Sequence, residues 1–193
     1  MFKELLVIFF GAAVVNNFVL YRFLGICPFM GVSRKTRSAV GMGLAVTFVM
    51  VIAGAITWAI YHFILEKFGL YYLQYVAFIL VIASLVQFIE LYMRKNVEDL
   101  YKAFGIYLPL ITTNCAILGL ALLNILKGYS FVQSLVFSIG AGAGFTLALV
   151  IMSGIRERLE LAEIPEPLKG VPIALIIAGL LALAFGAFTG MLK

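Results

Sequence analysis

The chain has 193 residues, of which 64% are hydrophobic and only 12% are charged, and its mean hydropathy is +1.14. A soluble domain carries about a quarter charged residues and roughly half apolar ones, so this composition excludes an ordinary soluble domain and indicates an integral membrane protein. The net charge of +5 does not indicate nucleic-acid binding, because the cations lie in short connections between apolar runs.

Six apolar runs follow one another along the chain, each long enough to supply the roughly 20 residues that a helix needs to cross about 30 Å of hydrocarbon. They cover residues 5–24 (with 32 as an alternative end), 38–65, 70–93, 103–126, 131–155 and 171–192. The short connections leave no room for a soluble domain. The sequence therefore predicts an all-α integral membrane protein, with six transmembrane helices in a single membrane domain over residues 1–193.

Positive charges in the connections predict an orientation. Nine Lys and Arg residues fall on one side of the predicted bundle and four fall on the other. Because cytoplasmic loops carry an excess of Lys and Arg, the first side is predicted to be cytoplasmic and both termini to face outward. The nine are Arg34, Lys35, Arg37, Arg94, Lys95, Lys102, Arg156, Arg158 and Lys169, and the four are Lys3, Lys67, Lys127 and Lys193. No cleavable signal peptide is expected, because the first run ends in two asparagines rather than in a small-residue cleavage site.

The two halves of the chain share a pattern. "GMGLAVTFVMVIAG" at residues 41–54 is similar to "GAGFTLALVIMSG" at residues 142–154, with an offset of 101 residues between the first glycines. Repeats of about 1–100 and 101–193 would each hold three helices, and because three is odd the second copy must be inverted in the membrane. Glycines at helix-packing positions also recur by chance in membrane helices, so the pattern leaves both explanations open.

The only two cysteines lie in the most irregular stretches, "FLGICPFMG" around Cys27 and "LPLITTNCAILG" around Cys115. Proline removes a backbone donor, glycine adds freedom, and Asn or Thr can satisfy freed backbone groups, so each stretch favours a broken helix. The residues concerned are Asn16, Asn17, Gly25 and Pro28 in the first half and Pro109, Thr112, Thr113 and Asn114 in the second. Broken helices at membrane depth usually line a site, although a lone cysteine in an apolar helix is more often a small inert hydrophobe.

Two thiols allow few kinds of site. Zinc and iron–sulfur centres are each held by about four ligands, commonly thiolates. The single histidine, His62, lies near the outer end of the second run, so a four-thiolate site would need a second subunit.

Helix geometry adds a condition to such a site. From Glu4 to Cys27 a straight helix would extend about 35 Å, whereas from Lys102 to Cys115 it would extend only about 20 Å. Both thiols can reach one centre only if the first segment breaks or re-enters, at Asn16-Asn17 or at Gly25.

At these residues the chain resembles a known family. "VNNFVLYRFLGICPFMGVS", "LPLITTNCAILGLALLN", "FILVIASLVQFIE" and "GIRERL" are similar to signature segments of the membrane subunits of the Rnf electron-transport complex. The wider family includes the paired small subunits of sodium-pumping NADH:quinone reductase, and the "NNFVL" and "CPFMG" segments are closer to the Rnf member. The similarity runs over nearly the whole chain.

The resemblance implies two inverted three-helix repeats whose broken helices carry the cysteines. It implies that Cys27 and Cys115 are metal ligands and hold one [2Fe–2S] cluster together with a homologous subunit of opposite topology, the E subunit. Thr113, Asn114 and the backbone amides near Gly25 and Pro28 would surround that cluster, although helix packing explains them equally well.

The resemblance also implies a function. The protein would be a non-autonomous subunit of a redox-driven translocase that passes electrons between reduced ferredoxin and NAD while moving sodium ions or protons. Its setting would be the cytoplasmic (inner) membrane of a bacterium or archaeon, with the B, C, D and G subunits and membrane lipid as further partners and no nucleic acid.

Two other functions are compatible with the residues alone. A small ion or solute transporter could use inverted repeats around a midplane site lined by polar groups such as Asn16, Asn17, Thr112 and Asn114. A passive membrane scaffold for other subunits would need no site at all.

Overall fold

The computed structural model describes residues 2–69, 71–96 and 108–187. Within these ranges the regular secondary structure is entirely helical, which confirms the predicted all-α class. In the first half the elements are α1 (Phe2–Phe10) with the π-helical turn η1 (Gly11–Val15), α2 (Ile26–Val32), α3 (Thr36–Ile60), η2 (Tyr61–Leu65), α4 (Glu66–Phe68), η3 (Tyr71–Leu73) and α5 (Gln74–Asn96). In the second half they are α7 (Leu108–Thr112), α8 (Cys115–Leu126), α9 (Phe131–Leu159), η4 (Glu166–Leu168) and α10 (Val171–Gly186).

Three stretches of the described chain are long and apolar enough to cross a membrane as single helical units. They are Thr36–Phe68, Tyr71–Tyr92 and Phe131–Leu159, with mean hydropathies of 2.3, 2.0 and 2.2. They match the predicted runs 38–65, 70–93 and 131–155, although residue 70 itself lies outside the described residues.

The other three predicted runs have a different form. Run 5–24 is helical only as far as Val15, and run 103–126 is interrupted between α7 and α8. Run 171–192 is helical from Val171 to Gly186. Residues 103–107 and 188–192 of these runs lie outside the described residues.

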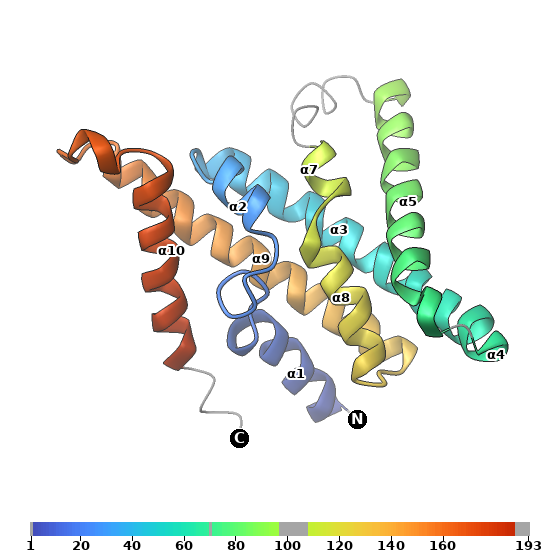
Figure 1. Ribbon diagram of the computed structural model, residues 1–193. Coiled ribbons are helices and arrows are strands. Elements are labelled where there is room, and N and C mark those ends of the chain that lie inside the picture. Colours follow the sequence, from blue (N-terminus) through green and yellow to red (C-terminus); the bar gives the residue numbers. More distant parts are fainter. Residues whose placement is uncertain (1, 70, 97–107, 188–193) are drawn as a thin grey trace.

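Helices α3 and α9 run antiparallel through the centre of the molecule (Figure 1). Contacts at both ends establish their direction: at one end the Thr36 backbone N–H donates to Glu157 Oε1 over 2.8 Å, and at the other Trp58 Nε1 donates to the Tyr129 carbonyl over 2.9 Å. The other helices lie around this pair, so α3 and α9 form the framework on which the cysteine-bearing segments are placed.

Small residues allow α3 and α9 to approach closely. A Cβ on Gly43 would lie 2.6 Å from the Thr146 methyl carbon, and a Cβ on Gly142 would lie 2.5 Å from the Thr47 methyl carbon. The two threonine hydroxyl oxygens are 3.4 Å apart across the interface. The contacts are reciprocal: Thr47 and Thr146, which pack on the glycines of the opposite helix, are 99 residues apart in the sequence. The alignment of the Gly-x-Gly motifs gave an offset of 101 residues instead.

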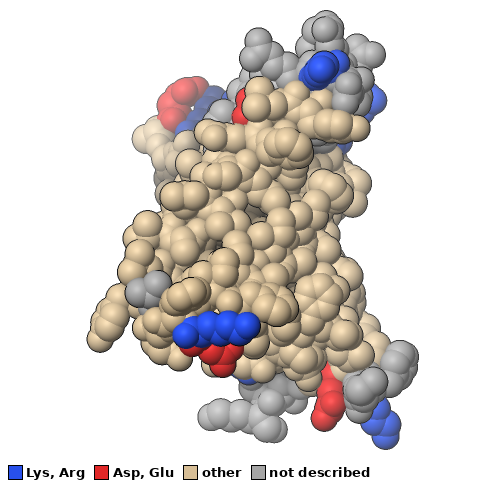
Figure 2. Space-filling model, turned by 90° about the vertical axis from the view of Figure 1, so that its right-hand side faces the viewer, with Lys and Arg blue, Asp and Glu red and all other residues tan. Residues whose placement is uncertain are grey.

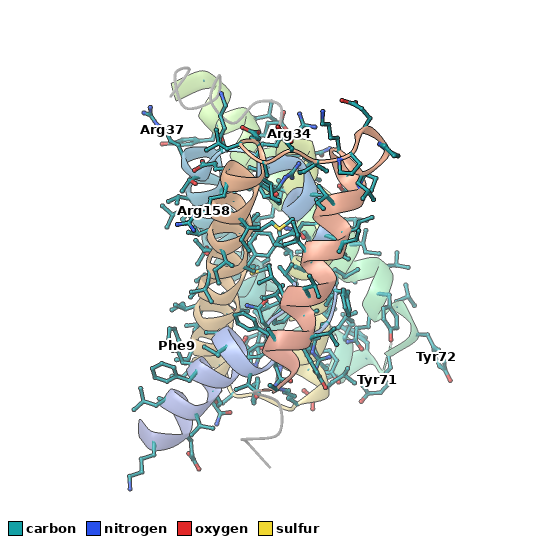
Figure 3. All side chains as sticks on the ribbon, turned by 90° about the vertical axis from the view of Figure 1, so that its left-hand side faces the viewer. Phe9, Arg34, Arg37, Tyr71, Tyr72 and Arg158 are labelled. Atoms are coloured by element: carbon teal, nitrogen blue, oxygen red, sulfur yellow. The ribbon has the colours of Figure 1, made fainter. Side chains whose placement is uncertain are left out.

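On the face of the molecule that Figure 2 shows, charged side chains gather toward the two ends, and a broad uncharged zone separates them. Arg34, Arg37 and Arg158 lie toward one end, while Tyr71 and Tyr72 lie toward the other (Figure 3). Of the other cations predicted on the cytoplasmic side, Lys102 lies outside the described residues. An uncharged belt between charged ends is the surface expected of a protein that spans hydrocarbon.

Candidate functional site

The first helix break begins directly after η1 and is organised by Asn17, which is fully buried. Its side-chain Oδ1 accepts hydrogen bonds from the backbone N–H groups of Val19 (3.0 Å) and Leu20 (3.3 Å). Its Nδ2 donates to the carbonyls of Ala13 (3.1 Å) and Gly144 (2.8 Å), the second of which lies on α9. Asn17 therefore satisfies backbone groups that the break releases and ties the broken segment to the central helix.

The same break ends at Gly25, the residue before α2. Phe23 has φ = 56° and Gly25 has φ = 80°, so the chain enters the left-handed region twice within three residues. The sequence predicted an interruption at Asn16-Asn17 or at Gly25, and the irregular segment extends from one to the other. This segment lies in the middle of the molecule (Figure 1).

The break removes the geometric difficulty that a straight first helix would create. Residues 2–15 form the continuous helical part of the first segment, which at 1.5 Å per residue is about 21 Å long. That length is close to the roughly 20 Å from Lys102 to Cys115 expected for the second segment. The described helices that lead into the two breaks, α1 and α7, approach them from opposite ends of the molecule (Figure 1).

The second break separates α7 from α8 at Thr113 and Asn114. Asn114 is the N-cap of α8, and its Oδ1 accepts a hydrogen bond of 3.0 Å from the Ala116 backbone N–H. An asparagine N-cap satisfies one of the otherwise unpaired amides in the first turn of a helix. Cys115 is consequently the first residue of the twelve-residue helix α8.

The two breaks are in direct contact. The Gly25 backbone N–H donates to Cys115 Sγ over 2.9 Å, across 90 residues of sequence. An ideal Cβ on Gly25 would lie 3.3 Å from both Ala116 Cβ and Asn114 Oδ1, and 2.7 Å from Phe145 Cε2. The first segment therefore approaches the start of α8 and Phe145 of α9 so closely that a Cβ at position 25 would force a neighbour to shift.

Both thiols belong to this region. Cys27 lies two residues after Gly25, so their Cα atoms are at most about 7.6 Å apart. Cys27 and Cys115 are both free, and both are exposed on the surface of this chain. Among the described residues no group of three or more His, Cys, Asp and Glu side chains could hold a metal ion. The site thus offers two outward-facing thiols. His62 lies on η2, the π-helical turn after α3, and its ring stacks on Trp58 with centroids 4.2 Å apart.

The remaining predicted site residues occupy different positions around the breaks. Pro28 is buried in the first turn of α2, where its lack of an N–H leaves no intrahelical bond unmade. Thr113 is exposed. Asn114 is 4% exposed, and its Nδ2 has no hydrogen-bond partner within the described part of the chain.

Two contributors to the site have no local sequence signal. Phe145 on α9 packs against Gly25, but its spacing from either cysteine carries no recognisable pattern. Arg156 Nη1 donates to the Met30 carbonyl (2.8 Å) and to Ser33 Oγ (2.9 Å). A cation at the last carbonyls of a helix stabilises that end, so Arg156 fixes the short helix that carries Cys27.

Comparisons with known proteins agree with the features described above. A sequence model of the Rnf-Nqr family, described as "Rnf-Nqr subunit, membrane protein", matches residues 5–192. The A subunit of an ion-translocating oxidoreductase complex from Syntrophotalea carbinolica is 61% identical, covering 98% of each chain. The A subunit of a Na⁺-translocating ferredoxin:NAD⁺ oxidoreductase complex from Acetobacterium woodii is 56% identical, covering 97% of each chain. The corresponding subunit of an ion-translocating oxidoreductase complex from Yersinia enterocolitica is 56% identical, covering 98% of each chain. The chain therefore belongs to the Rnf-Nqr family of membrane protein subunits.

Proposed function

We propose that this chain is the A subunit of an ion-translocating ferredoxin:NAD oxidoreductase complex and that Cys27 and Cys115 bind half of a [2Fe–2S] cluster. The other two ligands would come from the homologous E subunit of opposite topology. One observation carries the proposal: the hydrogen bond from Gly25 to Cys115 Sγ places the two cysteine-bearing breaks against each other.

The chemistry of the donor set fits such a cluster. [2Fe–2S] clusters are most often held by four cysteine thiolates, and one chain with two exposed thiols supplies half of that number. Cys115 is the first residue of α8, so a negatively charged cluster bound there would lie at the positive end of the helix dipole. Burying thiolates in a membrane is costly unless a metal centre offsets their charge, so a shared centre also explains why the thiols face outward.

The surrounding residues have defined tasks in this arrangement. The Gly25 N–H donates to sulfur, which is one of the means by which a protein tunes the potential of an iron–sulfur centre. Asn114 Nδ2 is a buried donor that finds no acceptor in the described chain and can serve a sulfur atom at the site. Asn17 holds the start of the first break in place, and Arg156 holds the C-terminal end of α2, the short helix that follows the break.

The position of the site suits a relay across the membrane. A bound [2Fe–2S] cluster supplies one-electron transfer between carriers. About 30 Å of hydrocarbon is too thick for one electron hop, and a cluster bound by these cysteines within the membrane would divide that distance. The wider function would be electron transfer between ferredoxin and NAD coupled to sodium or proton movement, with the B, C, D and G subunits.

The test measures iron in the intact complex. We expect the co-purified complex to contain iron and to give a [2Fe–2S] electron paramagnetic resonance signal, and we expect Cys27→Ser combined with Cys115→Ser to abolish the signal assigned to this site. Size-exclusion chromatography controls for assembly. An assembled double variant with unchanged iron and an unchanged signal would refute the ligand assignment.

The topology belongs to the same proposal. Six membrane crossings in two inverted repeats, about 1–100 and 101–193, are supported by the reciprocal packing of Gly43 on Thr146 and Gly142 on Thr47. The cation-rich end would face the cytoplasm and both termini would face outward. Labelling of a C-terminal tag by a membrane-impermeant reagent in intact spheroplasts tests this orientation, and labelling only after lysis would contradict it.

A transporter is less well supported. Asn17 uses its side chain in four hydrogen bonds and is fully buried, so it does not offer ligands to a solute. A passive scaffold would not require two helix breaks that bring the only two cysteines of the chain together.

A further inference from the structure

A second feature lies at the cation-rich end, and neither cysteine lines it. A cavity of about 380 Å³ opens between the end of α9, the connection that follows it and the start of α10, with Arg34 on another side. This volume falls within the range of roughly 300–1,000 Å³ that is typical of small-molecule sites.

The charged lining is predominantly positive. Three cations, Arg34, Arg156 and Lys169, line the cavity together with one carboxylate, Glu160. Lys169 also pairs with Glu166 at 2.5 Å, but both side chains are more than half exposed, with relative exposures of 53% and 86%. Because exposed ion pairs contribute little free energy, this pair does not prevent Lys169 from binding an anion.

The rest of the lining is apolar. Leu159 at the end of α9, Ile164 in the connection and Ile173 in the first turn of α10 contribute to the same cavity. A cavity that combines cations with aliphatic side chains, at the end of a membrane-spanning helix, matches an amphiphile better than a free inorganic anion. The charged group would meet the cations, and the glycerol and upper acyl carbons would meet the apolar residues.

We propose that this cavity binds the phosphate of an anionic phospholipid headgroup. Arg34 and Lys169 would contact the phosphate, and Arg can do so through two parallel hydrogen bonds. Arg156 adds charge at the cavity wall while its Nη1 holds the last turn of α2 through the Met30 carbonyl. A bound headgroup would therefore reinforce the residue that fixes the helix carrying Cys27. The proposal is independent of whether that cysteine binds iron.

The experiment uses the purified intact complex and a phosphatidylglycerol probe with a photoreactive group near the glycerol. A phosphatidylcholine probe with the same reactive group is the comparison, and inorganic phosphate is the soluble competitor. We expect the anionic probe to label peptides within residues 155–173 more strongly than the zwitterionic probe does. Each cation near an anionic lipid contributes about 1 kcal/mol of binding free energy, which corresponds to about fivefold in affinity. Arg34→Gln and Lys169→Gln should therefore each reduce labelling about fivefold.

Arg158→Gln provides a matched control, because Arg158 is exposed at the same end but does not line the cavity. It should leave labelling unchanged, and Arg34→Lys should retain most of it. Equal labelling by both probes, or an equal loss in Arg158→Gln, would show that only general surface attraction is at work and would overturn the proposal. Competition by inorganic phosphate as effective as that by unlabelled lipid would assign the cavity to a soluble phosphate and would also overturn it.

Discussion

Replacing Gly25 by alanine perturbs the contact between the two helix breaks directly. The added Cβ would lie 2.7 Å from Phe145 Cε2, a distance that real Cβ contacts do not show, and 3.3 Å from Ala116 Cβ. The backbone at this position has φ = 80°, which alanine rarely adopts. Both effects act on the residue whose N–H donates to Cys115 Sγ.

The expected magnitude combines two terms. A non-glycine residue held in the left-handed region costs roughly 1–2 kcal/mol, and overpacking a close contact costs typically 1–3 kcal/mol. Gly25→Ala should therefore lower the free energy of unfolding by about 2–5 kcal/mol. For a chain of this size we expect the melting temperature to fall by on the order of 10 °C. The altered position of the N–H should also change the rate at which Cys115 reacts with a maleimide, because the donor to its sulfur is displaced.

Gly31→Ala is the matched control, because it makes the same chemical change on α2 with a different environment. A Cβ on Gly31 would meet only Leu110 Cδ1 within 4 Å, at an ordinary distance of 3.9 Å. In a helix interior alanine is favoured over glycine by about 0.5–1 kcal/mol, so this variant should be neutral or slightly stabilising. The assays are thermal unfolding of the purified complex and the rate of thiol labelling. If Gly25→Ala and Gly31→Ala have the same melting temperature and the same rate of Cys115 labelling, the close approach of Gly25 to its neighbours is wrong.

Two further perturbations test the framework around the site. Asn17→Ala should lower the free energy of unfolding by about 2–6 kcal/mol, because four hydrogen bonds of roughly 0.5–1.5 kcal/mol each are lost. Asn16→Ala is the control and should have little effect. Equal melting temperatures for the two variants would contradict the role of Asn17. Gly144→Ala should destabilise the protein, because its Cβ would lie 2.5 Å from the Ala13 carbonyl oxygen, and a backbone atom cannot rotate away as a side chain can. Gly154→Ala on the same helix is the control, because a Cβ there meets nothing within 4 Å. A Gly144→Ala complex as abundant and stable as Gly154→Ala would count against the packing of η1 on α9.

Composition and local pattern were sufficient for the class of the protein. A hydrophobic fraction of 64% and long apolar runs predicted a helical membrane protein, and the described chain is helical throughout its regular elements. The interruptions near Asn16-Asn17, Gly25 and Asn114 were also predicted, because glycine and asparagine act on the backbone within one helical turn. Such effects are local, so the sequence carries them without reference to the rest of the fold.

Contacts between segments that are distant in the chain could not be predicted from the sequence. It allowed two positions for the first break, and the chain uses the whole segment between them. The repeat offset of 101 taken from the glycine motifs differs from the 99 residues that separate Thr47 and Thr146. A two-residue difference turns a helical side chain by about 200°, so the facing residues depend on how the two helices cross.

The sequence by itself determined that Cys27 and Cys115 lie beside helix breaks in a membrane protein. The tertiary structure decided that these breaks meet, that Gly25 donates to Cys115 Sγ and that both thiols face outward. It also decided that Phe145 and Arg156 support them from α9. The physical reason is that a break depends on residues within a turn of it, whereas its neighbours depend on the rotation and crossing of whole helices, which close packing of small side chains sets across the bundle.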